Sequence, residues 1–149
     1  MAAGRFVGID PLRVRTKRPD DTKIAHSILF VEYHTAFRQS ASYLMDQEPD
    51  LEVFSQAGSV ADGRQRMAEG GIDAAIADIP LPDEGAPEMV RDLHEANPSI
   101  PVLVMTAIED PEVHGRFLRA GASEVLGKGI SFEEVLAAVR RLGGGGEEG

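Results

Sequence analysis

The stretch Ala74-Ala75-Ile76-Ala77-Asp78 places a carboxylate at the end of a short apolar run. Three other short runs also lead into a polar side chain: Ile28–Val31 into Glu32, Val102–Met105 into Thr106, and Val125–Gly127 into Lys128. Short apolar runs between polar residues are typical of buried strands. In a parallel sheet the carboxyl ends of such strands meet at one edge, which is where open α/β sheets bind their ligands.

Amphipathic segments separate these runs. We expect strands at 27–32, 51–55, 74–77, 102–105 and 124–126, with helices at 35–47, 60–69, 87–96, 111–120 and 131–142. The first helix is expected to bury one apolar face, made of Phe37, Ala41, Leu44 and Met45. Five strand–helix repeats predict a doubly wound α/β fold with helices on both faces of a parallel sheet. The strand order 2-1-3-4-5 would place Glu32 beside Asp78.

Three helices begin with capping signals. Ser59 precedes the second helix, and Asp110 followed by a proline precedes the fourth. Ser131 and Glu134 have the spacing of a capping box at the start of the fifth. These signals support the expected helix starts independently of the apolar periodicity.

Composition restricts the class of protein. The 149 residues include no cysteine, which excludes disulfides, thiolate metal sites and cysteine catalysis. No apolar stretch approaches the roughly 20 residues that span a bilayer, and no signal peptide is visible, so we expect a cytoplasmic protein. The four histidines are scattered and indicate no histidine metal site. No phosphate-binding glycine loop of the Gly-x-x-x-x-Gly-Lys-Ser/Thr type is present, so nucleotide hydrolysis is not supported.

Charge divides the chain into regions. The net charge is −10, yet residues 1–25 hold six basic and three acidic side chains, against nine basic and 22 acidic in the remainder. We expect 1–25 to be a flexible arm, 26–142 one domain, and 143–149 a flexible glycine-rich tail. The acidic body argues against direct nucleic-acid binding. The arm is expected to be a solvated leader, with contact to nucleic acid or to an acidic partner as the alternative.

Several segments together resemble a known family. They are Ala77–Pro82, Val102–Ala107, Ala120–Ala122 leading to Lys128, and Glu48–Val53. In their order and spacing they resemble the receiver domain of bacterial two-component response regulators. The resemblance is closest to the branch that usually carries a helix-turn-helix output domain, and it covers all but the two ends of the chain.

The resemblance implies a role for each matching residue. Asp78 would accept a phosphoryl group from a histidine of a partner kinase or phosphotransfer protein. Thr106 and Lys128 would each bind a phosphoryl oxygen. Mg²⁺ would be held by Glu32, Asp78 and the backbone carbonyl of Pro80. The chain would thus act as a signalling switch rather than an enzyme, with a possible homodimer through 111–120, 124–126 and 131–142.

Two positions depart from the family pattern. The family has adjacent acids at the end of the first strand, whereas this chain has Glu32-Tyr33, so Mg²⁺ binding is expected to be weak or absent. Val125 stands where the family often has an aromatic switch residue. Two functions therefore stay open: a phosphorylatable receiver, or an atypical receiver that acts by protein contact without phosphorylation. Glu32 could equally be only an acidic neighbour of Lys128.

Overall fold

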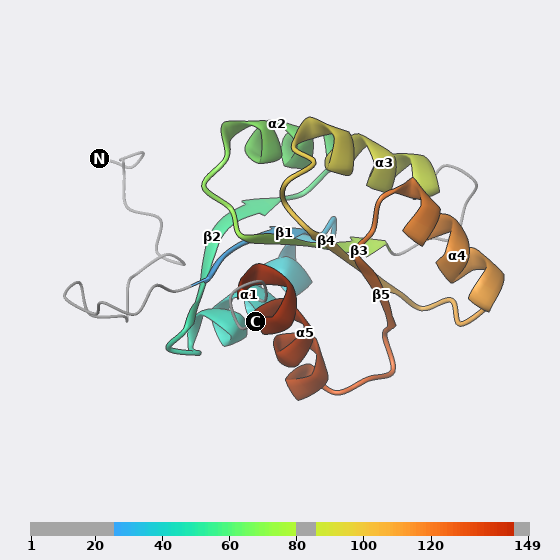
Figure 1. The fold of residues 1–149 in the computed structure, drawn as a ribbon. Coiled ribbons are helices and arrows are strands. Elements are labelled where there is room, and N and C mark those ends of the chain that lie inside the picture. The colour runs from blue at the N-terminus through green and yellow to red at the C-terminus, as the bar shows by residue number, and fades with distance from the viewer. Residues whose placement is uncertain (1–25, 80–85, 145–149) are drawn as a thin grey trace.

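The computed structural model describes residues 26–79 and 86–144, in which five strands and five helices alternate (Figure 1). The strands are β1 (His26–Val31), β2 (Leu51–Ala57), β3 (Ala74–Ile79), β4 (Val102–Thr106) and β5 (Glu124–Gly127). The helices are α1 (Thr35–Asp46), α2 (Val60–Glu69), α3 (Ala86–Ala96), α4 (Pro111–Ala120) and α5 (Phe132–Gly144). The arm at 1–25, most of the tail and Pro80 lie outside the described residues.

The five strands form one parallel sheet in the order β2-β1-β3-β4-β5, which confirms the expected topology. In Figure 1, α2, α3 and α4 lie on one side of the sheet and α1 and α5 on the other. β1 and β3 are neighbours at the centre, in register at Val31 and Ala77. The residues that directly follow this pair are Glu32 and Asp78, so the topology brings the two acids together.

The sheet separates two apolar clusters, because side chains alternate between its faces along each strand. Leu29, on β1, packs with α2, α3 and α4, whereas Ile28 packs with α1 and α5. Both side chains are fully buried, and burial of an aliphatic side chain of this size stabilises the fold by about 1.5–3 kcal/mol. Asp78 and Glu32 therefore sit at the end of strands that the core holds from both sides.

The expected helix caps are all made. The Ser59 hydroxyl accepts from the Asp62 N–H at 3.1 Å, and the Asp110 carboxylate accepts from the Glu112 N–H at 2.9 Å. The Ser131 hydroxyl accepts from the backbone N–H of Glu134 at 3.1 Å, while the Glu134 carboxylate accepts from the Ser131 N–H at 3.3 Å. These bonds satisfy N–H groups that have no partner within the helix.

Element ends differ from expectation at the functional edge. β3 continues through Asp78, which pairs with Met105, to Ile79, which pairs with Thr106. Asp78 and Thr106 therefore lie within paired strands rather than at the first positions of loops. At the other end of the domain, α5 extends to Gly144, two residues beyond its expected end at Leu142.

The orientation of α1 differs from expectation. Phe37 and Leu44 were expected in the core, yet their side chains are 53% and 52% exposed. Met45 is buried beside Asp46, whose carboxylate accepts from the N–H of Val53 on β2 at 3.1 Å. Because this bond draws the polar Asp46 toward the sheet, the helix turns part of its apolar face outward. The helical period of the sequence alone could not show which side of α1 faces the sheet.

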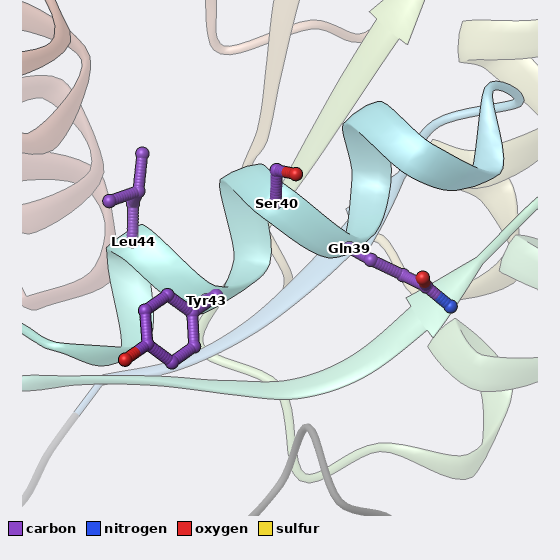
Figure 2. A pocket seen from close by; sticks show the side chains of 4 residues that line it. All are labelled: Gln39, Ser40, Tyr43 and Leu44. Atoms are coloured by element: carbon purple, nitrogen blue, oxygen red, sulfur yellow. The ribbon is translucent and has the colours of Figure 1, made fainter.

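The outward face of α1 borders an open cavity of about 420 Å³, lined by Gln39, Ser40, Tyr43 and Leu44. Figure 2 shows Ser40 and Leu44 projecting to one side of the helix and Tyr43 to the other. Tyr43 is 55% exposed. An exposed apolar surface on a small domain commonly marks a contact site for another molecule.

Candidate functional site

The strand ends bring three of the expected site residues together. Asp78 is the next-to-last residue of β3, Thr106 ends β4, and Lys128 follows the last residue of β5. The Lys128 ammonium forms an ion pair with the Asp78 carboxylate. The backbone N–H of Lys128 also donates to the Thr106 carbonyl at 2.9 Å, which ties the start of the β5–α5 loop to β4.

Asp78 is a buried acid with only 7% of its surface exposed. Burial raises the pKa of its carboxyl group, and the contact with the neighbouring Glu32 raises it further. The ion pair with Lys128 opposes both effects, and the resulting pKa is about 7. The group is therefore poised to change its protonation state near neutral pH.

Glu32 is 2% exposed, and several contacts stabilise its charge. Burial disfavours the charged form, but hydrogen bonds with Asp78 and with the backbone of His34 outweigh it and hold the pKa of Glu32 below its ordinary value. Lys128 lowers this pKa further through its charge. Glu32 thus carries the negative charge of the acid pair, and Asp78 carries the proton below neutral pH.

Two residues that we did not expect at the site hold Glu32 in place. The His34 N–H donates to Glu32 Oε2 at 2.9 Å, and His34 Nδ1 lies 3.2 Å from the same oxygen. An Arg38 guanidinium nitrogen donates to the Glu32 carbonyl at 2.8 Å. The His34 side chain is 63% exposed. The one sequence feature that could have indicated this contact is that His34 lies two residues after Glu32.

Thr106 is 2% exposed, and its hydroxyl faces the loop before α4. Thr106 Oγ1 accepts from the N–H of Ile108 at 3.1 Å. A hydroxyl has one proton to donate in addition to its acceptor positions. The side chain therefore links the end of β4 to the first turn of the loop and can still donate to a nearby oxygen.

The described residues offer Glu32 and Asp78 as candidate Mg²⁺ ligands, and Mg²⁺ is usually held by one or two carboxylates together with phosphate. Within residues 26–79 and 86–144, no three His, Cys, Asp or Glu side chains are placed to hold a metal ion. Glu32 and Asp78 supply two carboxylates, already engaged by His34 and Lys128. Tyr33 is 62% exposed and makes an edge contact with the His34 ring at 4.8 Å. Its phenol is thus largely exposed to solvent.

The fold is that of an α/β domain with charged residues at the carboxyl edge of its sheet, and comparison with known proteins gives the family. The family model for the response regulator receiver domain matches residues 28–140. The chain therefore belongs to the receiver domains of response regulators. Proteins of this family act in two-component signalling.

Individual relatives agree with this assignment. The chain is 32% identical over 118 residues to the DNA-binding transcriptional activator DevR/DosR of Mycobacterium tuberculosis, covering 79% of this chain and 54% of that protein. It spans about half the length of the curated relatives that it matches. The Mycobacterium tuberculosis relative is a DNA-binding transcriptional activator.

Solved structures share the fold. A LuxR-family two-component response regulator from Aurantimonas sp. SI85-9A1 aligns with a TM-score of 0.72 and 21% identity, covering 81% of this chain and 86% of that one. A CheY-like receiver domain from Methanospirillum hungatei aligns with a TM-score of 0.68 and 23% identity, covering 84% and 99%. Within the described residues, no helix is both long and apolar enough to cross a membrane.

Proposed function

We propose that this chain accepts a phosphoryl group on Asp78 from a histidine kinase or a phosphotransfer protein. The observation that carries the proposal is the buried Asp78 carboxylate, ion-paired with Lys128 at the sheet edge where Thr106 ends the next strand. A buried acid with a raised pKa and a specific charge partner is a mark of functional sites.

The chemistry follows from the groups present. An ionised Asp78 oxygen attacks the phosphorus of a phosphohistidine, forming an acyl phosphate as the phosphorus–nitrogen bond breaks, and the leaving imidazole takes up a proton. Lys128 neutralises charge on one phosphoryl oxygen, and the Thr106 hydroxyl donates to another. Positioning and charge neutralisation supply most of the rate in phosphoryl transfer. The proton that Asp78 holds below neutral pH must leave before attack.

The deciding experiment is intact-mass analysis after treatment with acetyl phosphate, with and without Mg²⁺. Native protein should gain one phosphoryl mass and Asp78→Asn none. Asp92→Asn, which alters an exposed carboxylate on α3, is the matched control and should label like the native chain. Equal labelling of native protein and Asp78→Asn would rule out the assigned role.

A second function is favoured by one specific observation. Tyr33 stands where the family has its second metal-binding acid, so one carboxylate of the usual pair is missing. On this basis the domain would act as a protein-contact module, without phosphorylation. No labelling of native protein at high Mg²⁺ would favour this function over the first.

The outward face of α1 is the surface that we propose for the phosphodonor protein. Arg38, in the first turn of α1, donates to the Glu32 carbonyl, and its chain neighbour Phe37 is exposed. Changing Phe37 and Leu44 together to serine should slow transfer from a phosphorylated histidine-kinase domain, while labelling by acetyl phosphate stays native. Met89→Ser, on α3, is the control and should slow neither reaction. Equal loss with both donors would contradict a docking role.

A homodimer through α4, β5 and α5 is a further part of the proposal. Leu118 on α4 and Phe132 at the start of α5 are 47% and 36% exposed. A modest interface of this kind would lie at the low end of the usual range of about 1,200–2,000 Å². Sedimentation at high concentration, with and without acetyl phosphate, should show a dimer that Leu118→Glu abolishes. A chain that stays monomeric under both conditions would contradict self-association.

We propose that residues 26–142 form the receiver unit, flanked by an arm at 1–25 and a tail at 143–149. The support is that both apolar clusters are built from residues between Ile28 and Leu142. A chain trimmed to 26–144 should unfold with the same midpoint as the full chain. A large loss of stability on trimming would show that the arm belongs to the folded unit.

A further inference from the structure

The loop between β4 and α4 is held through one residue, Ile108. Its N–H donates to Thr106 Oγ1 at 3.1 Å, and its carbonyl lies 2.6 Å from Nε2 of His114. A carbonyl oxygen only accepts hydrogen bonds, so the His114 ring must donate through a protonated Nε2. The two bonds form a continuous connection from the Thr106 hydroxyl, through one residue's backbone, to a side chain of α4.

His114 belongs to the first turn of α4, and the same turn is capped from the loop. The backbone N–H groups of Val113 and His114 donate to the Asp110 carbonyl at 3.0 and 3.1 Å. The Asp110 carboxylate caps the helix at Glu112. The start of α4 is therefore attached to the loop at two places, by the Asp110 cap and by the His114 ring. A shift of Ile108 cannot leave this turn unaffected.

Thr106 is the residue whose movement would reach this connection. Its side chain is buried, and its Oγ1 accepts from Ile108 at a distance close to the upper limit for a good hydrogen bond. If Thr106 turns its hydroxyl toward an oxygen on Asp78, Oγ1 moves away from the Ile108 N–H. Ile108 must then follow or lose its acceptor, and its carbonyl pulls on His114.

We propose that His114 is a positioning residue that transmits the orientation of Thr106 to α4. The neighbouring strand does not offer this connection, because β5 contributes Val125, an apolar side chain packed against the core cluster. The effect of phosphorylation on α4 rests on the proposed function at Asp78. The connection between Thr106 and α4 in the unmodified chain does not depend on that proposed function, and it can be tested separately.

The first experiment uses the unmodified full chain and amide hydrogen exchange followed by NMR. His114→Ala should speed exchange of the Ile108 amide and of the first-turn amides of α4 by about five- to tenfold, the effect expected for one lost hydrogen bond. His114→Gln keeps an N–H donor and should restore much of the protection. Arg116→Ala, an exposed change on the same helix, is the matched control and should leave exchange unchanged.

A double-mutant cycle decides whether the two bonds act as one connection. Thr106→Val removes the acceptor for Ile108, and it should also shift the His114 ring nitrogen signals. The exchange effects of Thr106→Val and His114→Ala should be non-additive, because each change disrupts the same connection. Additive effects, or His114 ring signals indifferent to Thr106→Val, would overturn the proposal.

The second experiment adds acetyl phosphate. Native protein and His114→Ala should reach the same phosphoryl mass, but only the native chain and His114→Gln should show large shifts of the α4 amide signals. An equal α4 response in labelled His114→Ala would also overturn the proposal. Failure of the native chain to label would count against the proposed function at Asp78, while the first experiment would still decide the role of His114.

Discussion

Glu32 and Asp78 directly follow Val31 and Ala77, which are paired on the neighbouring strands β1 and β3, and the interaction between the two acids shifts their pKa values in opposite directions. It lowers the pKa of Glu32 and raises that of Asp78, which burial and this contact together bring to about 7. The pair therefore holds about one proton as pH approaches neutrality.

The stability of the native chain should fall as pH rises through about 7, relative to Asp78→Asn. The pKa of Asp78 is raised in the fold from 3.8 to about 7, so its stabilising contribution is complete below 3.8 and is lost above the folded value. Asparagine is neutral throughout. Between pH 5 and 8 the difference in unfolding free energy should move by roughly 1–4 kcal/mol in favour of the variant. Urea unfolding at several pH values measures it.

The control for this prediction is Asp92→Asn. The difference in unfolding free energy between this variant and the native chain should not change between pH 5 and 8. Glu32 acts in the opposite direction, because its pKa is lowered in the fold. The charged Glu32 stabilises the fold above pH 4.5, and this stabilisation is lost as pH falls below that value. A difference between native protein and Asp78→Asn that does not change from pH 5 to 8 would contradict the raised pKa.

Lys128→Gln should slow labelling of Asp78 by acetyl phosphate by tenfold or more at pH 7, as expected for loss of a charge contact in phosphoryl transfer. Lys128 lowers the pKa of Asp78, so its removal should also shift the rise of the labelling rate to higher pH. Time courses by intact mass from pH 6 to 9 measure both effects. Arg116→Gln supplies the control for loss of one positive charge. An unchanged pH profile in Lys128→Gln would contradict the ion pair.

Tyr33→Asp should create Mg²⁺-dependent stability that the native chain lacks. The exposed phenol offers no ligand, whereas a third carboxylate beside Glu32 and Asp78 would give hard-cation coordination. Saturating Mg²⁺ should stabilise the variant by about 1–3 kcal/mol through mass action. Thermal unfolding with and without Mg²⁺ measures it, with Tyr33→Asn as the neutral control. A strong Mg²⁺ effect on the native chain would refute the coordination argument.

Gly121→Ala should destabilise the fold more than Gly70→Ala. Both glycines have positive φ, +122° and +82°, which is strained for alanine. A Cβ at Gly121 would lie 2.6 Å from Cγ of His94, whereas one at Gly70 would meet nothing within 4 Å. We expect about 1 kcal/mol of loss at Gly70 and about 2–4 kcal/mol at Gly121. Urea unfolding compares the pair, and equal losses would show that the His94 ring moves aside freely.

The order of the elements and the edge of the site were predictable from sequence. Apolar runs such as Ala74–Ala77 alternate with capped amphipathic segments, and in a parallel sheet these dictate which strand ends meet. For this reason Asp78 and Lys128 could be placed together before any coordinates were known. The meeting of these strand ends depends only on periodicity and chain direction, which are properties of the sequence itself.

Tertiary structure alone decided how each of these groups is held. The outward face of α1, with Phe37 exposed, depends on Asp46 bonding to the backbone of β2. The pKa of Asp78 depends on burial and on the Glu32 contact, neither of which local pattern records. The His114 contact with Ile108 depends on the path of a loop. Periodicity identifies which residues reach the site, whereas their charges and contacts depend on neighbours distant in the chain.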